Sequence, residues 1–370
     1  MVSEKGRGSG GLSGRPLMKR LPACIFIPAW LALTAPPASG GQGAARISLA
    51  VLGDSNVFES DSAAVPDRIG RVWAEVGGRV RPAGRLALCA DYSAGADVYS
   101  AHPSETRHVH TARLFAETGY HQRLSTGAEL RGRTKTFMRD GRGYAVWSAS
   151  PFIRMNLFGR AVMRLGWSAG GFDYTPSSAF DFRSSEWSAA VESSPLPSVK
   201  WSLRTCSRSL EFERRAVGRT GRETPEPEWR FLDVRQRDRT WETAASIEAY
   251  WYALWTCRFS IQGNRSNSFG YSYRDPFLEF GFGKMLPWGL NVRAFWTHRK
   301  KTYADGLEAL IRIRPDAEDE TSSQALLDLS RRFGNGWTGR MRAARYRNES
   351  PIRALYYRKT IASMGLSREW

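Results

Sequence analysis

Segments in which apolar and polar residues strictly alternate recur along this chain after residue 46, and few folds accommodate so many of them. In one clear example Met163, Leu165 and Trp167 fall on one face of an extended chain, while Arg164 and Gly166 fall on the other. The same two-residue period runs through three further segments, 199–206, 255–262 and 289–296. A period of two indicates β-strands with one apolar face, and strands of about ten residues can cross a bilayer when tilted.

The connections between these segments alternate in length. Short turns are expected at 81–84, 120–124, 156–160, 193–198, 250–253, 284–289 and 333–336. Longer polar connections are expected near 53–68, 95–106, 139–143, 172–184, 214–238, 263–275, 299–321 and 347–352. A soluble β-sandwich or propeller also alternates along its strands, but it has no reason to keep short and long connections in strict alternation. The pattern predicts an all-β fold, a closed antiparallel transmembrane β-barrel over residues 46–370. The expected number of strands is about 16, within a range of about 14 to 18.

Strand parity divides the side chains of such a barrel between the lipid and the lumen. The predicted lipid face includes Met163, Leu165, Trp167, Trp201, Leu203, Phe259, Val292 and Met341. The predicted basic residues of the lumen are Arg131, Arg204, Arg258, Arg293 and Arg340. Acidic residues share the lumen face, so one interpretation is a ladder of cross-strand ion pairs that compensates itself. Because bases outnumber acids on that face, we favour an interior that attracts anions.

Aromatic residues cluster close to the expected turns and loops, as they do in the interfacial girdles of membrane barrels. The residues predicted for these girdles are Trp187, Trp241, Trp288, Trp337, Tyr144 and Tyr357.

The chain is strongly basic, with a formal net charge of +18. Its longest basic run is the short segment "RKK", and it contains no nucleic-acid-binding motif, so we expect no nucleic acid as partner. Cys89, Cys206 and Cys257 are too widely spaced for a metal site or a dense disulfide framework. His108 and His110 share a strand face and could clamp a metal, although two surface imidazoles beside a loop are the simpler interpretation. No cofactor and no metal site is predicted.

The N-terminal residues 1–45 are predicted to be a signal peptide. A basic stretch that starts at Met18 precedes the apolar run 21–36, and small residues follow. These are the three parts of a secretory signal. The apolar run is too short and too proline-rich for a membrane-spanning helix, and a buried N-terminal helix is the alternative. We expect the true start near Met18 and cleavage between Ser39 and Arg46.

The C-terminal residues end on a large aromatic side chain. Trp370 shares a strand face with Leu366 and Met364, and Gly365 stands between those two. This arrangement is similar to the sorting signal read by the bacterial barrel-assembly machinery, and Gly365, Leu366 and Trp370 are the residues that carry it. Arg368 departs from that pattern, which has an apolar residue there, but a long side chain can snorkel at the membrane edge.

An internal repeat links two C-terminal segments 84 residues apart. Asn264, Ser266, Tyr273, Arg274 and Gly281 recur with the same spacing as Asn348, Ser350, Tyr357, Arg358 and Gly365. Each copy is expected to be a strand, an outer loop and a return strand, with the Tyr-Arg pair near the outer end of the return strand.

Two stretches resemble known bacterial barrels. The segment "LGDSNVFES" resembles the "DSN-apolar" opening of many of them, including barrels linked to exopolysaccharide secretion. The segment "GWTGRMRAARYRNESPIRALYYRKTIASMGLSREW" resembles the closing strands of surface lipoprotein assembly modifier barrels. Those proteins usually carry a tetratricopeptide domain before the barrel, whereas here the expected signal peptide runs straight into the first strand. The resemblance therefore implies a barrel-only relative.

The segment "AVLGDSNV" also has the form of the first block of GDSL hydrolases, in which the serine after Gly-Asp is the nucleophile. That chemistry needs a histidine base oriented by an aspartate three residues earlier. No Asp-x-x-His sequence occurs in the chain. A GDSL-type or lumen-edge lipid hydrolase is thus the least favoured alternative; we expect no enzyme and name no catalytic residue.

Three functional classes remain open from the sequence. They are a channel or translocation pore with a basic lumen, an assembly or secretion factor for surface lipoproteins or exopolysaccharide, and a structural anchor. We favour the channel. The expected location is the outer membrane of a Gram-negative cell. The expected partners are outer-membrane lipid, lipopolysaccharide and the barrel-assembly machinery, with an exported lipoprotein or an anionic solute as further candidates.

Overall fold

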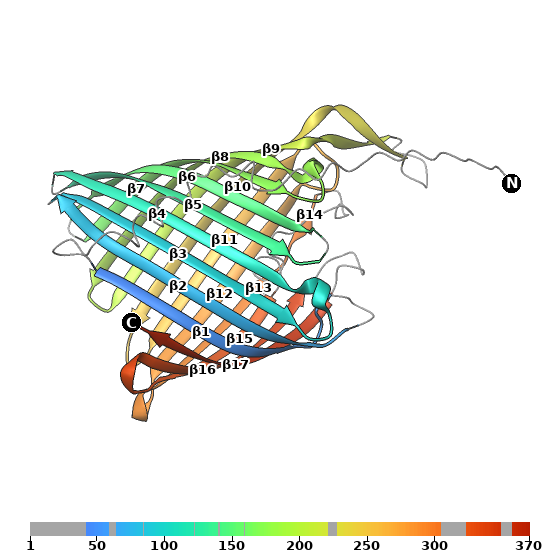
Figure 1. Cartoon of the computed structure of the whole chain (residues 1–370). Helices are drawn as coiled ribbons and strands as arrows, with labels where there is room; N and C mark the ends of the chain where they lie inside the picture. The colour runs from blue at the N-terminus through green and yellow to red at the C-terminus, as the bar shows by residue number, and fades with distance from the viewer. Residues whose placement is uncertain are drawn as a thin grey trace.

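The computed structural model describes residues 42–58, 64–83, 85–121, 123–139, 141–158, 160–220, 228–304, 323–348 and 357–370. Within these residues the chain forms one closed barrel of antiparallel strands (Figure 1). The predicted signal peptide, residues 1–45, lies outside the described residues except for residues 42–45. Those four belong to the first strand, which begins at Gln42 rather than at the expected Arg46.

The wall is built from strands that follow one another along the chain. They are β1 (Gln42–Asp54), β2 (Asp67–Ala83), β3 (Leu86–Tyr99), β4 (Arg107–His121), β5 (Leu124–Phe137), β6 (Gly143–Asn156), β7 (Ala161–Tyr174), β8 (Phe182–Leu196), β9 (Val199–Thr220), β10 (Glu228–Tyr250), β11 (Leu254–Ser266), β12 (Tyr273–Met285), β13 (Leu290–Arg299), β14 (Thr302–Tyr303), β15 (Ser323–Arg332), β16 (Trp337–Asn348) and β17 (Tyr357–Glu369). The short β14 pairs with β12 just beyond β13 and continues that strand, so the barrel has 16 strands.

The barrel closes where its first strand meets its last. β1 pairs with β17 in antiparallel register, from Arg46 opposite Glu369 to Asp54 opposite Ile361. All other neighbours in the wall are consecutive along the chain, once β14 is counted with β13. Closure pairs the backbone groups that an open sheet edge would leave without partners in a bilayer. The predicted closed antiparallel barrel of about 16 strands is confirmed.

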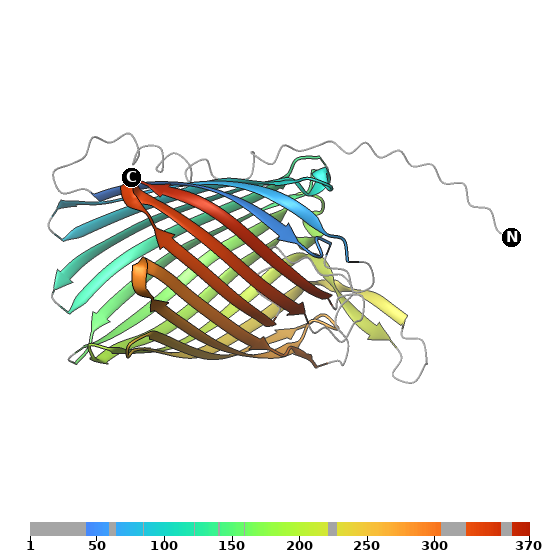
Figure 2. The ribbon, with the colours of Figure 1, turned by 90° about the horizontal axis from the view of Figure 1, so that it is seen from below.

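Short and long connections alternate as the sequence predicts. Every predicted short turn joins two strands at the end that also holds the start of β1 and the C-terminus (Figures 1 and 2). Every predicted longer connection lies at the opposite end. We call the short-turn end the inner rim and the opposite end the outer rim.

Within the described residues, four single-turn 3₁₀ helices lie in the connections. Those at the outer rim are η3 (Pro103–Glu105) and η4 (Ser178–Phe180), and those at the inner rim are η5 (Pro287–Gly289) and η6 (Gly334–Gly336). Among the described residues, no helix is long and apolar enough to cross a membrane.

One hairpin rises above the rest of the outer rim. β9 and β10 have 22 and 23 residues, and their paired ends extend past β8 and β11 (Figure 1). The last partner of β8 on β9 is Phe212, and the last partner of β11 on β10 is Asp238. Beyond these positions the two strands pair only with each other.

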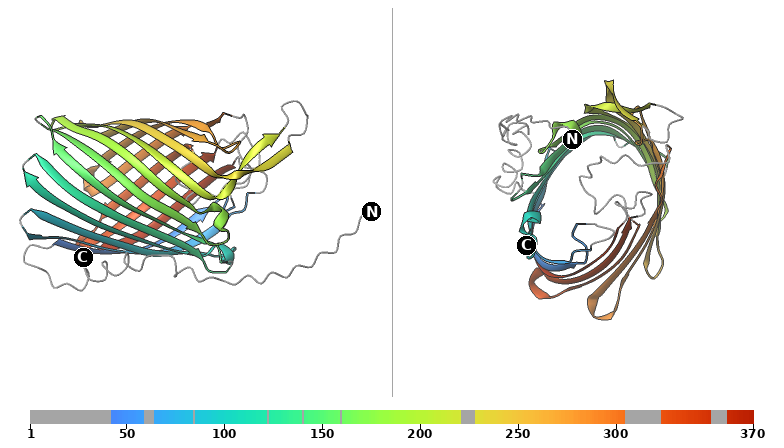
Figure 3. Two further views of the ribbon diagram at one scale, coloured as in Figure 1. Left: turned by 90° about the horizontal axis from the view of Figure 1, so that it is seen from above. Right: turned by 90° about the vertical axis from the view of Figure 1, so that its right-hand side faces the viewer.

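The two faces of the wall differ sharply in chemistry. Of the predicted lipid-facing residues, Leu165, Trp167, Trp201, Leu203, Phe259 and Met341 are exposed, while Met163 and Val292 are half-buried. Side chains of the opposite parity meet across an intervening strand: Arg164 on β7 contacts Glu129 on β5, and Arg299 on β13 contacts Gln262 on β11. The end-on view in Figure 3 shows the strands closing into a ring. Such contacts form on the concave side of a closed wall, so the charged face is the interior.

Aromatic side chains gather at the inner rim on the outer surface. Trp201, Trp251, Trp255, Trp288, Trp337 and Trp370 are all exposed there, close to strand ends or in turns. Trp187 and Trp241 are exposed nearer the outer rim. The prediction for Tyr144 and Tyr357 is wrong, because these side chains are only 4% and 2% exposed. Both lie at strand positions of inward parity, where they fill space inside the outer rim instead of facing lipid.

Candidate functional site: the charged interior wall

The interior wall carries a cluster of charges centred on Glu129. The Glu129 carboxylate accepts hydrogen bonds from Arg113 at 2.5 Å and from Arg131 at 2.7 Å. The guanidinium group of Arg164 lies 4.0 Å from the other oxygen of the Glu129 carboxylate. Glu129 is buried, whereas the three guanidinium groups are each about half exposed. Glu129 therefore contacts three cations that face the interior, of which Arg113 also pairs with Asp91 at 3.5 Å.

Two inward phenylalanines lie beside this cluster. Phe115 on β4 and Phe152 on β6 stack with ring centroids 5.6 Å apart, and the Arg164 guanidinium sits 3.9 Å above the Phe152 ring. The strand between them has Gly127 at this level, where an added Cβ would come within 2.5 Å of the Phe152 ring. Glycine at 127 thus allows the ring to lie flat against the wall, which leaves the interior open at this point.

Sharing of one carboxylate by several bases recurs elsewhere on the wall. Glu186 on β8 lies 3.6 Å from Arg204 and also accepts a hydrogen bond from Arg208 at 2.7 Å. Nearer the outer rim, Asp97 on β3 pairs with Arg71 at 2.6 Å and with Arg107 at 3.0 Å. At these places the fixed positive charge exceeds the negative charge.

The five arginines predicted for the lumen all have inward parity, and four of them hold ion pairs. The pairs are Arg131 with Glu129, Arg204 with Glu186, Arg258 with Glu242, and Arg340 with Asp328. No described carboxylate lies within ion-pair distance of Arg293, although Asp328 is its cross-strand neighbour on β15. The ion-pair ladder considered from the sequence is therefore present, but several of its acids are shared between bases.

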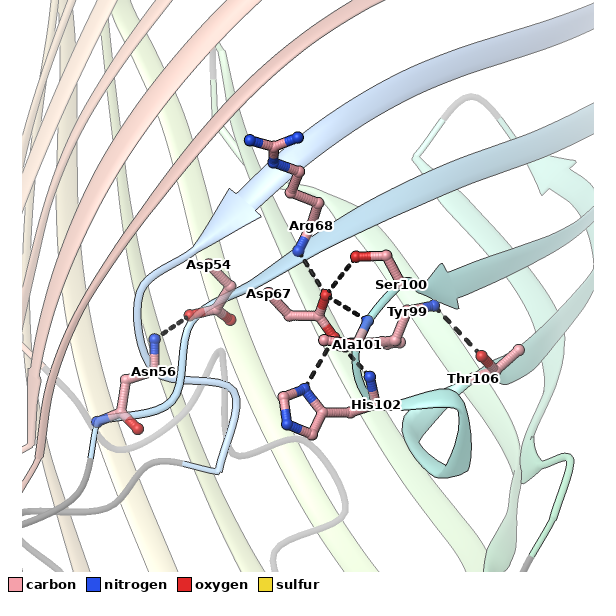
Figure 4. Close-up of polar contacts among 9 residues, drawn as sticks. All are labelled: Asp54, Asn56, Asp67, Arg68, Tyr99, Ser100, Ala101, His102 and Thr106. Atoms are coloured by element: carbon pink, nitrogen blue, oxygen red, sulfur yellow. Dashed lines mark hydrogen bonds and ion pairs between the residues drawn. The ribbon is translucent and has the colours of Figure 1, made fainter.

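At the outer rim, Asp67 is the hub of a network that holds the β3–β4 loop (Figure 4). It accepts hydrogen bonds from the Ser100 hydroxyl at 2.7 Å, from the Ala101 N–H at 3.0 Å and from the His102 N–H at 3.0 Å. The His102 ring and the Arg68 N–H complete the set. Burial alone would raise the pKa of the Asp67 carboxyl, but these hydrogen bonds hold that pKa well below its ordinary value.

The "DSN" segment fastens the end of β1 to the start of β17. The Ser55 N–H donates to the Thr360 carbonyl at 3.1 Å, and the Thr360 N–H donates to the Ser55 hydroxyl at 2.8 Å. The Asn56 side chain donates to the Arg358 carbonyl at 3.3 Å. The buried Asp54 carboxylate lies 3.7 Å from Lys359 Nζ. Ser55 thus contributes to the closure of the barrel, and none of its contacts involves a histidine as a hydrolase nucleophile would require.

The two copies of the repeat have the same pairing. Asn264 is the cross-strand partner of Tyr273 on β11 and β12, and Asn348 is the partner of Tyr357 on β16 and β17. In both copies the tyrosine opens its strand at the outer rim with inward parity, and Arg274 and Arg358 follow it with outward parity. Ser350 lies outside the described residues.

The first copy of the repeat also shows what its polar residues do. The Asn264 amide donates to Asp238 at 3.1 Å and to the Tyr271 carbonyl at 2.8 Å. The Ser266 hydroxyl donates to Asp238 at 2.6 Å. These bonds tie the β11–β12 loop to β10, which is the role in loop structure that the sequence suggests for Asn and Ser.

The predicted assembly signal lies along the closing seam. Trp370 follows the end of β17, and its N–H and carbonyl bond the carbonyl and N–H of Ala45 at 2.9 and 3.2 Å. Leu366 and Trp370 are exposed on the outer surface, while Gly365 has inward parity. The Arg368 guanidinium lies between the rings of Trp337 and Trp370, 5.6 and 4.9 Å from their centroids. This contact accommodates the charge that departs from the expected apolar pattern.

His108 and His110 lie on the outer surface of β4. The His110 ring is 2.8 Å from the Tyr92 hydroxyl, so its neighbour on this face is a phenol. Among the described residues no group of three or more metal-ligating side chains comes together.

Several residues of the interior escaped the sequence reasoning. Asp67, Asp97 and Phe152 were not singled out, because their importance comes from contacts with strands far along the chain. Parity alone places Phe152 inward, since Ile153 beside it is exposed on the outer surface. The alternation signal could therefore have identified this aromatic residue, but not its stacking on Phe115.

Comparisons with known proteins give no family. No protein-family model matches the chain, and no curated protein matches its sequence. Among solved structures, OccAB3 of Acinetobacter baumannii matches with 8% identity and a TM-score of 0.47, covering 90% of this chain and 100% of that one. OccK2 (OpdF) of Pseudomonas aeruginosa, in complex with glucuronate, matches with 10% identity and a TM-score of 0.46, covering 89% and 97%.

CdiB of Acinetobacter baumannii matches with 8% identity and a TM-score of 0.49, covering 87% of this chain and 60% of that one. At identities of 8 to 10% and TM-scores of 0.46 to 0.49, these similarities assign the chain to no family. The resemblance to surface lipoprotein assembly modifier barrels stays a prediction. The function has to be inferred from the interior wall itself.

Proposed function

We propose that this barrel is an outer-membrane channel whose aqueous interior admits small polar solutes and favours anions over cations. The observation that carries the proposal is the sharing of single carboxylates by several guanidinium groups, at Glu129, Glu186 and Asp97. In each case the fixed charge of the group is positive. Fixed positive charge on a low-dielectric wall concentrates counter-ions, so anions are enriched along it.

Three features support a membrane channel. A barrel of 16 strands encloses a lumen wide enough for water. Its outer surface is apolar between aromatic residues at the two rims, which is the exterior that a bilayer requires. The predicted signal peptide and the terminal aromatic residue agree with export to the outer membrane.

The test is a reversal-potential measurement on the full-length folded barrel in planar bilayers under a potassium chloride gradient. At low salt we expect the reversal potential to lie closer to the chloride equilibrium potential than to the potassium equilibrium potential. We also expect the preference to fade toward about 1 M salt, where the Debye length is about 3 Å. Replacing Arg293 and Arg258 by glutamine should reduce the preference, whereas Arg331→Gln, on the outer surface at the inner rim, should leave it unchanged.

Two results would count against the proposal. Cation preference at low salt would refute the charge argument, even if the barrel conducts. Absence of any conductance from a barrel shown to be folded would refute the channel. It would favour the assembly or anchoring alternatives, and a search for an exported partner that co-purifies with the barrel would follow.

A further inference from the structure

The outer surface at the outer rim carries arginines over one part of its circumference. They stand at outward positions of β10, β11, β12, β16 and β17, and all are exposed: Arg239, Arg265, Arg274, Arg345, Arg347 and Arg358. We call these six residues the outer arginine band. Arg274 and Arg358 are the arginines of the repeated Tyr-Arg pair. The repeat therefore points a tyrosine inward at the rim, half-buried in the first copy and buried in the second, and presents an arginine outside it.

Two pairs within the band face each other directly. Arg239 is the cross-strand partner of Arg265, and Arg347 is the partner of Arg358. Side chains in such positions have Cβ atoms about 5 Å apart, and like charges directly opposite one another are unfavourable. No described carboxylate lies within ion-pair distance of Arg239, Arg265 or Arg274, which leaves these exposed guanidinium groups accessible to an external anion.

The other basic residues of the outer surface are arranged differently. At the inner rim, Lys284 stands opposite Val292, and Arg331 stands opposite Leu290. On the opposite side of the outer rim, Arg183 is paired with Asp173 at 3.5 Å. Arg239 and Arg265 thus differ from these residues, because they face each other and no described carboxylate lies within ion-pair distance of either.

The position of the band relative to the apolar surface indicates where the anion comes from. Trp241 follows Arg239 on the same face toward the middle of the barrel and is exposed. On the same face, Met341 lies four residues before Arg345 and Met364 lies six residues after Arg358. These two side chains are 57% and 66% exposed. The band therefore borders the apolar surface at the level of lipid headgroups, and an anion held there also contacts acyl chains.

We propose that the outer arginine band binds the phosphate groups of a phosphorylated lipid in the outer leaflet. A guanidinium group matches a phosphate in geometry and donates two parallel hydrogen bonds to it. A phosphate placed between Arg239 and Arg265 would turn their mutual repulsion into attraction to a shared ligand. The lipid chains would lie against the apolar side chains below the band. This inference does not depend on whether the lumen conducts.

The experiment uses the full-length folded barrel in a neutral detergent and native mass spectrometry to count bound lipid. The probes are bisphosphorylated lipid A, the same lipid with its phosphates removed, and inorganic phosphate. The test variant is Arg239→Gln/Arg265→Gln. The matched control is Arg183→Gln/Arg331→Gln, which removes the same charge from the outer surface outside the band.

We expect wild type and control to retain bisphosphorylated lipid A and the test variant to bind it at least about tenfold more weakly, since each basic residue near a charged lipid surface contributes about fivefold. Dephosphorylated lipid should be retained poorly by all three proteins. The comparison of the two lipids on wild type needs no variant and holds even if the double substitution impairs folding.

Equal retention of the two lipids by wild type would overturn the proposal. So would equal binding by the test variant and the control. Displacement of the lipid by inorganic phosphate at the same molar concentration would show that the band holds free phosphate and would overturn the lipid as its occupant.

Discussion

Gly365 on β17 lies directly opposite Ala50 on β1, at the seam that closes the barrel. A Cβ atom at position 365 would stand 2.7 Å from the Leu49 carbonyl oxygen and 2.9 Å from the Ala50 Cβ. The carbonyl oxygen belongs to the β1 backbone and the Ala50 Cβ is bonded directly to it, so neither atom can move without shifting β1. The small residue of the predicted assembly signal thus lets the last strand approach the first.

Substitution of Gly365 by valine should weaken the seam. Overpacking of a tight contact costs about 1–3 kcal/mol, and here the strain falls on the pairing that closes the wall. We expect a smaller fraction of heat-modifiable, folded barrel in outer-membrane fractions. Gly53→Ala is the matched control, because Gly53 also lies at the seam and an added Cβ there meets no atom within 4 Å. Equal losses in the two variants would contradict this explanation.

Deletion of Trp370 should reduce the amount of assembled barrel without changing synthesis. The deletion removes both main-chain hydrogen bonds to Ala45 and the aromatic ring beside Arg368. Pulse labelling measures synthesis, and gel mobility before and after heating measures assembly. Trp370→Phe keeps the backbone bonds and an aromatic face, so it should assemble nearly as well as wild type. Normal assembly of the deletion would refute the prediction.

Replacement of Asp67 by asparagine should destabilise the outer rim at neutral pH. The carboxylate accepts bonds from three successive residues at the start of the loop, Ser100, Ala101 and His102. Each charge-assisted hydrogen bond contributes about 1.5–3 kcal/mol. An amide offers one acceptor oxygen in place of two, so some of these donors lose their partner. Urea unfolding of the refolded barrel at pH 7 measures the difference between the variant and wild type.

The same pair of proteins tests the protonation of Asp67. Because folding depresses the pKa of Asp67, its contribution to stability is present above the ordinary value of 3.8 and is lost as the pH falls below it. The stability gap between wild type and Asp67→Asn should therefore be constant near neutral pH and shrink in acid. A gap that does not change down to pH values well below 3.8 would contradict the hydrogen-bonded carboxylate.

Replacement of Glu129 by glutamine should strengthen the anion preference of the channel. The substitution keeps the side-chain shape but removes the one negative charge shared by Arg113, Arg131 and Arg164. The reversal potential at low salt should move further toward the chloride equilibrium potential. Glu211→Gln is the control, since Glu211 pairs with Arg237 on the outer surface. A shift of the same size in the control would assign the effect to net charge instead of the interior wall.

The sequence predicts the strand connectivity of the barrel well because two independent patterns support it, one along each strand and one in the lengths of the connections. Alternation along a strand separates Trp167 from Arg164, and alternation of connection lengths fixes the direction of every strand. Each predicted turn and loop spans a junction between two strands in the structure. The predicted connection 214–238 is longer than the observed one, because β9 continues to Thr220 and β10 begins at Glu228. Neither pattern depends on knowing which residues meet across strands, so neither requires the three-dimensional register.

The contacts that make the candidate site do depend on register. Parity shows that Glu129 and Arg164 face the same side, but their meeting across β6 follows from the stagger of three strands. Tyr144 and Tyr357 show the opposite failure: closeness to a strand end predicts a girdle position, yet parity turns both side chains inward. For both tyrosines, strand parity predicts the observed inward position and closeness to a turn does not.

The seam also constrains the order in which this chain can fold. Its contacts join residues very far apart, with a separation of 302 residues for Asn56 and Arg358 and 321 for Arg46 and Ser367. Hairpins of neighbouring strands close short loops, whereas the entropy cost of closing a loop grows with its length. Until Trp370 reaches Ala45, β1 and β17 are open edges with unpaired backbone groups, which a bilayer tolerates poorly. A sheet that grows hairpin by hairpin therefore keeps two open edges until one ring-closing step pairs β1 with β17.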